Sequence, residues 1–308
     1  MKDKKSEKVN MAKMNAIFTR FLQENRSKSP AELKRIMEAA MRNAEIPCRS
    51  QEEDAHLAQD IIYDAWETNR KSERIKLAKK ALYLSPDCAD AYNILAEDAA
   101  KSSEDAKEYY QKGMEAGRRA LGEKIFKEDS GHFWGMIETR PYMRSRAGLM
   151  QCLWEEEKHD DAINHAKEML KLNRNDNQGI RYILIAYLAV LGRYDELDTF
   201  MNKGDYNDDG MAEWLYTRSL LSFVKKGVSK KTDKELAAAL QRNIHVPKYL
   251  TGKKQIPRVL PDSITVGGED EAYCYAAANI EAWKKVPGAI DWLKERAAIK
   301  IVSKARHA

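Results

Sequence analysis

The chain is a succession of amphipathic segments that come in pairs, each pair interrupted by a short polar turn. One pair reads "DAHLAQDIIYDAWET" and "ERIKLAKKALYLSPD", joined by "NRKS" and stopped by Ser85-Pro86. Apolar residues recur in each segment at helical spacing, so each helix carries one apolar face. A single pair cannot bury these faces alone, and neighbouring pairs must stack to form a continuous core. The sequence therefore predicts an array of helix pairs.

Composition and turn residues also favour helices over sheets. Charged residues make up 33% of the 308 residues and apolar ones 43%, with 15 glycines and 8 prolines. Straight-chain residues such as Leu, Lys and Glu lose little side-chain freedom in a helix. Ser29, Pro30 and Glu32 match the S-x-x-E capping box, and Ser72 is a candidate cap within "NRKS". Helices are thus expected to begin directly after the polar turns.

One pair carries a recognisable pattern of aromatic, leucine and small residues: Tyr92, Leu95, Ala96, Ala106, Tyr110 and Gly113. Ala81 and Pro86 match the end of the preceding unit, whereas Arg174 replaces the closing proline of a later one. The pattern resembles the tetratricopeptide repeat (TPR) family over roughly residues 55–245, with units of about 34 to 39 residues. The resemblance implies an all-α, TPR-like superhelical array of roughly four to six antiparallel helix pairs.

Three regions are expected along the chain. Residues 1–50 form an N-terminal helical extension, residues 51–245 the TPR-like array, and residues 246–308 an irregular loop with a C-terminal capping helix pair. Apolar residues in the loop are expected to pack it against the array: Tyr249, Leu250, Ile256, Val259 and Leu260. The terminal helices are expected to cap the end of the stack.

The motif most suggestive of a metal is "GDYNDDG", residues 204–210, in which alternating polar residues precede a glycine as in a calcium loop. The twelfth position of such a loop needs a bidentate glutamate, but Tyr216 stands there and Glu213 comes three residues too early. A polar turn that caps the next helix is the preferred interpretation. The four cysteines form no C-x-x-C pair, so neither a zinc knuckle nor a disulfide framework is indicated. No metal and no cofactor are predicted.

Three arginines recur at intervals of 37 residues in presumptive first helices: Arg144, Arg181 and Arg218. Each has a tyrosine close by in the sequence: Tyr142, Tyr182 and Tyr216. The TPR resemblance implies that first helices line a concave groove, where an arginine fork can bind a carboxylate and tyrosine offers apolar contact. The alternative is a structural role, with the arginines bound to Glu155, Glu156 or nearby carbonyl groups, and Arg146 can replace Arg144 if the repeat register differs.

The sequence predicts a scaffold or adaptor without catalytic activity. Its expected partner is a protein or a peptide segment, and acidic segments are among the candidates. No stretch approaches the roughly 20 apolar residues of a membrane span, and scattered cysteines with a charged amino terminus favour a cytoplasmic location. Nucleic acid is not the expected partner. One alternative is nevertheless an anionic-surface or nucleic-acid binder that uses the lysines at 225–234 and 253–254. A further alternative is an enzyme centred on His132, Glu138 and Arg140.

Overall fold

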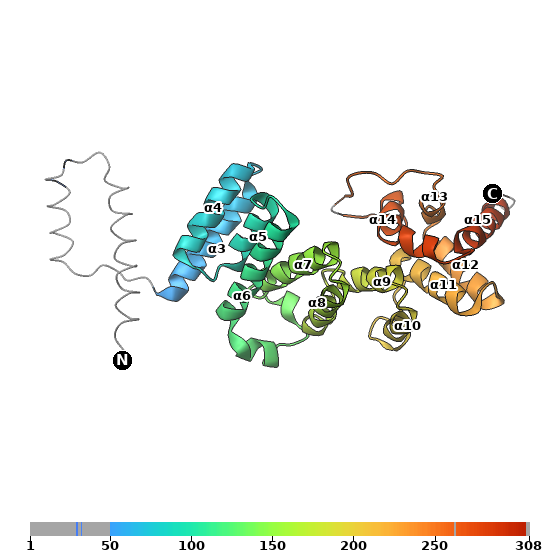
Figure 1. Cartoon of the computed structure of the whole chain (residues 1–308), viewed down its shortest axis with the longest axis horizontal. Helices are drawn as coiled ribbons and strands as arrows, with labels where there is room; N and C mark the ends of the chain where they lie inside the picture. The colour runs from blue at the N-terminus through green and yellow to red at the C-terminus, as the bar shows by residue number, and fades with distance from the viewer. Residues whose placement is uncertain (1–28, 30–31, 33–49, 262, 306–308) are drawn as a thin grey trace. The chain divides into compact units, whose positions relative to one another are not determined.

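The computed structural model of the chain describes residues 29, 32, 50–261 and 263–305 (Figure 1). The chain divides into two units, Met1–Asp54 and Ala55–Ala308, and nearly all of the described helices belong to the second. In the first unit, the backbone N–H of Glu32 donates to Ser29 Oγ and the N–H of Ser29 donates to Glu32 Oε2, which confirms the predicted capping box. The predicted extension over residues 1–50 otherwise lies outside the described residues.

Every regular element in the described part of the chain is helical, as predicted. The α-helices, in chain order, are α3 (Gln51–Glu67), α4 (Lys71–Leu84), α5 (Ala89–Asp98), α6 (Ser103–Glu128), α7 (Arg140–Glu155), α8 (His159–Leu172), α9 (Ile180–Val190), α10 (Tyr194–Lys203), α11 (Ala212–Lys226), α12 (Lys230–Arg242), α13 (Val246–Leu250), α14 (Glu269–Lys285) and α15 (Ala289–Ala305). A short 3-10 helix, η1 (Phe133–Gly135), precedes α7. Helices α3 to α12 form consecutive pairs, and the helix-pair architecture expected from the sequence is confirmed.

The first three helices of unit 2 share a core built largely from small side chains. Ala58 and Ala65 of α3 and Ala78 and Ala81 of α4 are fully buried, and isoleucines of α3 and α5 fill the space between the helices. Alanines at a contact allow helix axes to approach to about 8–10 Å. Helix α4 begins at Lys71 with Arg70 as its N-cap, so the predicted Ser72 cap is wrong, whereas the end of α4 before Ser85 is confirmed.

Glycines set the close contact between α6 and α7. Gly148 of α7 faces the ring of Tyr110 on α6 so closely that a Cβ atom at this position would overlap the ring. Gly113 of α6 likewise lies against Ser145 of α7, and both glycines leave room that any other residue would fill. Further along α6, Gly122 adopts φ 71° and kinks the helix, a backbone conformation that favours glycine. These contacts fix α7 beside α5 and α6.

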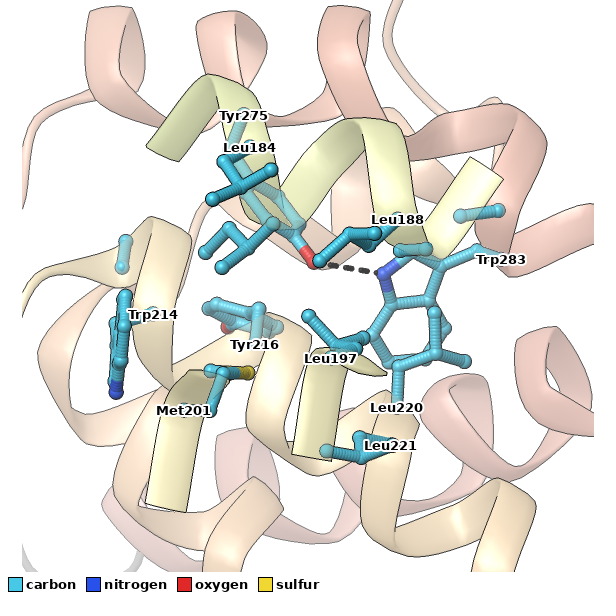
Figure 2. Close-up of a cluster of buried hydrophobic side chains, with 14 of the residues drawn as sticks. Leu184, Leu188, Leu197, Met201, Trp214, Tyr216, Leu220, Leu221, Tyr275 and Trp283 are labelled. Carbon is cyan, nitrogen blue, oxygen red and sulfur yellow. Dashed lines mark hydrogen bonds between the residues drawn. The ribbon is translucent and has the colours of Figure 1, made fainter. Parts of the chain in front are cut away.

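The C-terminal helices α14 and α15 pack against helices of the repeat array. Helix α14 packs against α9 and α11, the first helices of two consecutive pairs, and α15 packs against α12 (Figure 1). Figure 2 shows where α9, α10, α11 and α14 meet, with Trp214, Tyr216, Tyr275 and Trp283 among the buried side chains. The indole N–H of Trp283 donates to the hydroxyl oxygen of Tyr275 at 2.9 Å, so both polar groups are satisfied inside this core. Helix α14 therefore covers the face of α9 and α11 that it contacts.

The predicted loop begins with α13 and is irregular between α13 and α14, and only part of it packs as predicted. Tyr249 and Leu250 are buried and Ile256 is half-buried, but Val259 is 84% exposed and Leu260 is 42% exposed, so the prediction that these two residues pack on the array is wrong. Three consecutive acidic residues at the start of α14 hold the base of the loop. Glu269 binds Lys254, Asp270 accepts from the N–H of Thr265, and Glu271 accepts from the N–H of Gly267.

Candidate functional site

Two exposed aromatic side chains stand together on α3. Tyr63 is 44% exposed and Trp66 is 39% exposed, and their ring centroids are 5.7 Å apart. The two rings lie next to the buried residues Ile62 and Ala65, on the side of α3 that faces α5 and α7. Gln59, one helical turn before Tyr63, contacts Asp90 of α5, and Trp66 contacts Arg144 of α7. We call the surface formed by Gln59, Tyr63, Trp66 and Arg144, with the buried Asp90 beneath it, the aromatic face. It is built from three first helices, α3, α5 and α7.

A buried ion pair supports the aromatic face from below. Arg144 of α7 donates Nε to Asp90 Oδ1 at 2.8 Å and Nη2 to Asp90 Oδ2 at 2.5 Å. Asp90 is fully buried and also accepts from the amides of Gln59 and Asn93, so its carboxylate is well satisfied. The guanidinium of Arg144 lies 5.0 Å from the ring centre of Trp66, within cation–π range. Arg144 thus keeps one side toward solvent while its charge is balanced by Asp90.

Arg181 lies in a second network at the start of α9. Its Nη1 donates to Asp176, its Nε donates to Asp209, and its guanidinium lies 4.1 Å from the ring centre of Tyr182. Asp176 also accepts the backbone N–H groups of Ile180 and Arg181 and so caps α9. Asp209 accepts from the hydroxyl of Tyr182 as well, at 2.9 Å. Arg181 and Tyr182 therefore hold a helix start and the α10–α11 turn together.

Arg218 has backbone partners instead of a carboxylate. Its Nη2 donates to the carbonyl oxygens of Met201 and Asn207, on the α10 side of α11. Tyr216, two residues earlier and hence about 200° around the helix, contacts Tyr275 of α14 and donates its hydroxyl to the carbonyl of Asn243. Arg218 and Tyr216 consequently face different neighbours and do not line one groove.

Two of the predicted tyrosines offer no surface to a partner. Tyr142 is 2% exposed and packs edge-on against Phe126 and Phe133, while Tyr216 is fully buried. Tyr142 and Tyr216 are therefore core residues of α7 and α11. Of the six predicted binding residues, only Arg144 lies beside exposed aromatic side chains.

The motifs that the sequence suggested for metal binding, catalysis or anion binding do not form such sites in the described residues. In "GDYNDDG", Asp209 accepts from the N–H of Met211 and from Arg181, as a turn residue does, and no cluster of potential metal ligands occurs in the described residues. Within the same described part, His132, Glu138 and Arg140 make no hydrogen bond with one another, and Arg140 instead donates to the carbonyl of Trp134. Lysines of the two basic segments form ion pairs, Lys225 with Asp198 and Lys254 with Glu269.

A set of buried carboxyl groups was not predicted from the sequence. Burial, together with the neighbouring acids Glu271 and Asp209, raises the pKa of Glu213, in the first turn of α11, from 4.5 to about 7. Glu213 Oε2 is buried without a hydrogen-bond partner. Glu271 is fully buried but is satisfied by Asn243 and the N–H of Gly267. Glu213 and Glu271 lie where α11 meets α14.

Sequence reasoning missed Tyr63, Trp66 and Asp90. The spacing of Tyr63 and Trp66 places them at the edge of the apolar stripe of α3, a signal that could have marked them as exposed. Asp90 is separated from Arg144 by 54 residues, and nothing local in the sequence indicates that pairing.

The fold is that of a helical-repeat protein, and its helix α3 presents two exposed aromatic side chains. Within the described residues, no helix combines the length and the apolar character needed to cross a membrane. A family model described as "ST7 protein" matches residues 39–132 and 217–303, more than half of the chain. The chain belongs to the ST7 family. The repeat architecture expected from the TPR resemblance holds, but the family is ST7.

Curated relatives include "Suppressor of tumorigenicity 7 protein-like" of Gallus gallus, 26% identical over 261 residues, which cover 76% of this chain and 45% of the relative. The human protein of the same description is 26% identical over 76% of this chain and 44% of its own length. "Protein ST7 homolog" of Drosophila melanogaster is 26% identical, covering 76% of this chain and 47% of the relative. The chain thus spans less than half the length of these relatives.

Among solved structures, the chain is similar to YrrB, described as "a TPR protein with an unusual peptide-binding site". The sequence identity is 19% and the TM-score 0.42, and the match covers 67% of this chain and 90% of YrrB.

Proposed function

We propose that this chain is a scaffold without catalytic activity that binds a segment of another protein on the aromatic face. Tyr63 and Trp66 provide the apolar contact, and Arg144, held by Asp90, fixes the position of the Trp66 ring. The single observation that carries the proposal is the exposure of both aromatic rings beside an ordered arginine. Arg181, Arg218 and Tyr182 remain part of the fold in this proposal, since each is engaged by neighbouring residues.

Exposed aromatic side chains next to one another are characteristic of binding surfaces. Tyrosine and tryptophan supply large contact areas at a small cost in side-chain entropy, and with arginine they are enriched among the residues that dominate binding energies. Scattered single apolar residues on a surface need no explanation, but a contiguous pair supported by a buried ion pair does. Both rings lie on α3, which is the first helix of its pair. The helices that α14 covers, α9 and α11, are also first helices.

A photo-crosslinking amino acid placed at residue 63 tests the proposal in cells that express the full chain. We expect a crosslinked partner, identified by mass spectrometry, whose yield falls at least about tenfold when Trp66 is replaced by alanine. Tyr83 is the matched control because it is 64% exposed on α4, a second helix, away from the aromatic face. Equal crosslinking of the same partner from residues 63 and 83, or a yield unaffected by Trp66→Ala, would refute the proposal.

A further inference from the structure

The aromatic face is surrounded by negative charge. Helix α3 carries six acidic residues and no lysine or arginine, although the chain as a whole has a net charge of +5. Asp60, Asp64 and Glu67 flank Tyr63 and Trp66, and all three are exposed. None of the three forms an ion pair with another residue in the part of the chain that the structure describes. Within the described residues, the helix therefore presents a negative surface around its two exposed rings that no basic side chain offsets.

The arginine in the face does not offset this charge. Arg144 makes a two-point contact with the fully buried Asp90, so the pair is electrically neutral. The first cations after α3 along the chain are Arg70, in the turn, and Lys71, the first residue of α4, which lies 4.0 Å from Asp98. An acidic partner, which the sequence analysis included, would meet repulsion from Asp60, Asp64 and Glu67. A basic partner would be attracted by them.

The exposed rings can themselves receive cations. The guanidinium of Arg144 over Trp66 shows that this ring lies in a suitable orientation for a cation–π contact on one side. Among the described residues, no lysine or arginine stands over the ring of Tyr63, which is 44% exposed. A lysine or arginine side chain of a partner can therefore lie across Tyr63 and reach Asp60 or Glu67, one helical turn to either side.

The conformation of the partner is suggested by helix α14. It covers α9 and α11, which are first helices as α3, α5 and α7 are. Small buried side chains at helical spacing, Ala272, Ala276 and Asn279, let α14 approach its neighbours closely. First helices of this chain thus accept a packed helix on a face that their own pairs leave free.

We infer that the segment bound at the aromatic face is a helix of a partner protein that carries lysine or arginine beside a face of small and aliphatic residues. The inference rests on the proposed function and adds the charge and the conformation of the partner.

Binding of three designed peptides to the full chain, followed by fluorescence anisotropy, tests the inference. The first is an 18-residue amphipathic helix with alanine and leucine on one face and lysine and arginine on the other. The second carries glutamate in place of the basic residues, and the third has the composition of the first with a central proline. We expect the basic helix to bind, more weakly at high salt, and the other two to bind at least about tenfold more weakly.

Variants of the chain assign the binding to the face. Asp60→Asn/Asp64→Asn/Glu67→Gln should weaken the basic helix about tenfold, because three attractive charges are lost. The matched control is Asp161→Asn/Glu168→Gln/Asp195→Asn, three exposed acids on the second helices α8 and α10, which should change nothing.

Each contrary result has a distinct meaning. Equal or tighter binding of the acidic peptide, no binding of the basic peptide, or no effect of the triple α3 variant would overturn the basic charge of the partner. Equal binding of the proline peptide would overturn its helical conformation. In all of these cases, the crosslink from residue 63 and its dependence on Trp66 would still be observed if the proposed function is correct. Failure of the inference about the partner can therefore be distinguished from failure of the proposed function.

Discussion

Replacing Glu213 with glutamine should stabilise the chain at neutral and alkaline pH and leave it nearly unchanged at acidic pH. The carboxyl group of Glu213 is mostly buried at the start of α11, its Oε2 lacks a hydrogen-bond partner, and Glu271 and Asp209 lie close by. Glutamine keeps the size and shape of the side chain but cannot ionise. The substitution therefore removes only the cost of placing a negative charge there.

The size of the effect follows from the pKa. The pKa of Glu213 is raised from 4.5 to about 7 in the folded chain, mainly by burial. Since the folded state binds the proton more tightly, unfolding releases it between these values, and stability contributed by this group is lost as pH rises from about 4.5 to 7. At about 1.4 kcal/mol for each pKa unit, the loss approaches about 3 kcal/mol above pH 7 as an upper limit.

Urea unfolding followed by tryptophan fluorescence measures this difference, because Trp214 is the neighbouring residue and is fully buried. The free energies of unfolding of the wild type and Glu213→Gln should agree within about 0.5 kcal/mol at pH 4.5 and diverge steadily up to pH 7.5. A difference that is the same at both ends of the pH range would refute the reasoning, since a contribution independent of pH cannot come from ionisation of Glu213.

Three further substitutions test the packing, each by the free energy of unfolding. Gly148→Ala should destabilise the chain by about 1–3 kcal/mol, because a Cβ would overlap Tyr110, whereas Gly135→Ala, with no atom within 4 Å of the new Cβ, should have little effect. Asp90→Ala should cost about 2–4 kcal/mol by leaving Arg144 without its carboxylate, and Asp60→Ala, which changes an exposed acid, should cost less than about 0.5 kcal/mol. Tyr275→Phe should cost about 1–3 kcal/mol because the indole N–H of Trp283 loses its acceptor in a buried site. If Gly148→Ala, Asp90→Ala or Tyr275→Phe left the free energy of unfolding unchanged, the contact that the substitution removes or disturbs would not contribute to stability.

Helices α3 to α12 were predictable because each carries an apolar stripe of helical period and most are separated by polar turns, such as the break before Ser85-Pro86. These are local properties, and repeats reinforce them. Single caps were less certain: α4 begins at Lys71, one residue before the expected cap Ser72, and Arg70 is its N-cap.

Long-range contacts could not be predicted in the same way. The small-residue spacing of α14 indicates that one of its faces is buried but does not identify α9 as a neighbour, which precedes it by about 80 residues in the chain. Similarly, Arg144 was recognised as a candidate from its repeat spacing, but its pairing with Asp90 depends on how α5 and α7 pack. The net charge of the aromatic face depends on that pairing, so the repeat spacing of the arginines alone does not indicate the charge of a partner.

The position of α14 also determines which fragments of this chain can be studied in isolation. A truncation after α12, where the predicted repeats end, would uncover Tyr216, Leu184 and the other side chains that meet Tyr275 and Trp283 in Figure 2. Such a fragment would expose an apolar surface in solution and should aggregate. The smallest soluble piece that keeps the C-terminal pairs must therefore extend beyond Lys285, so the array and its last helices behave as one folding unit.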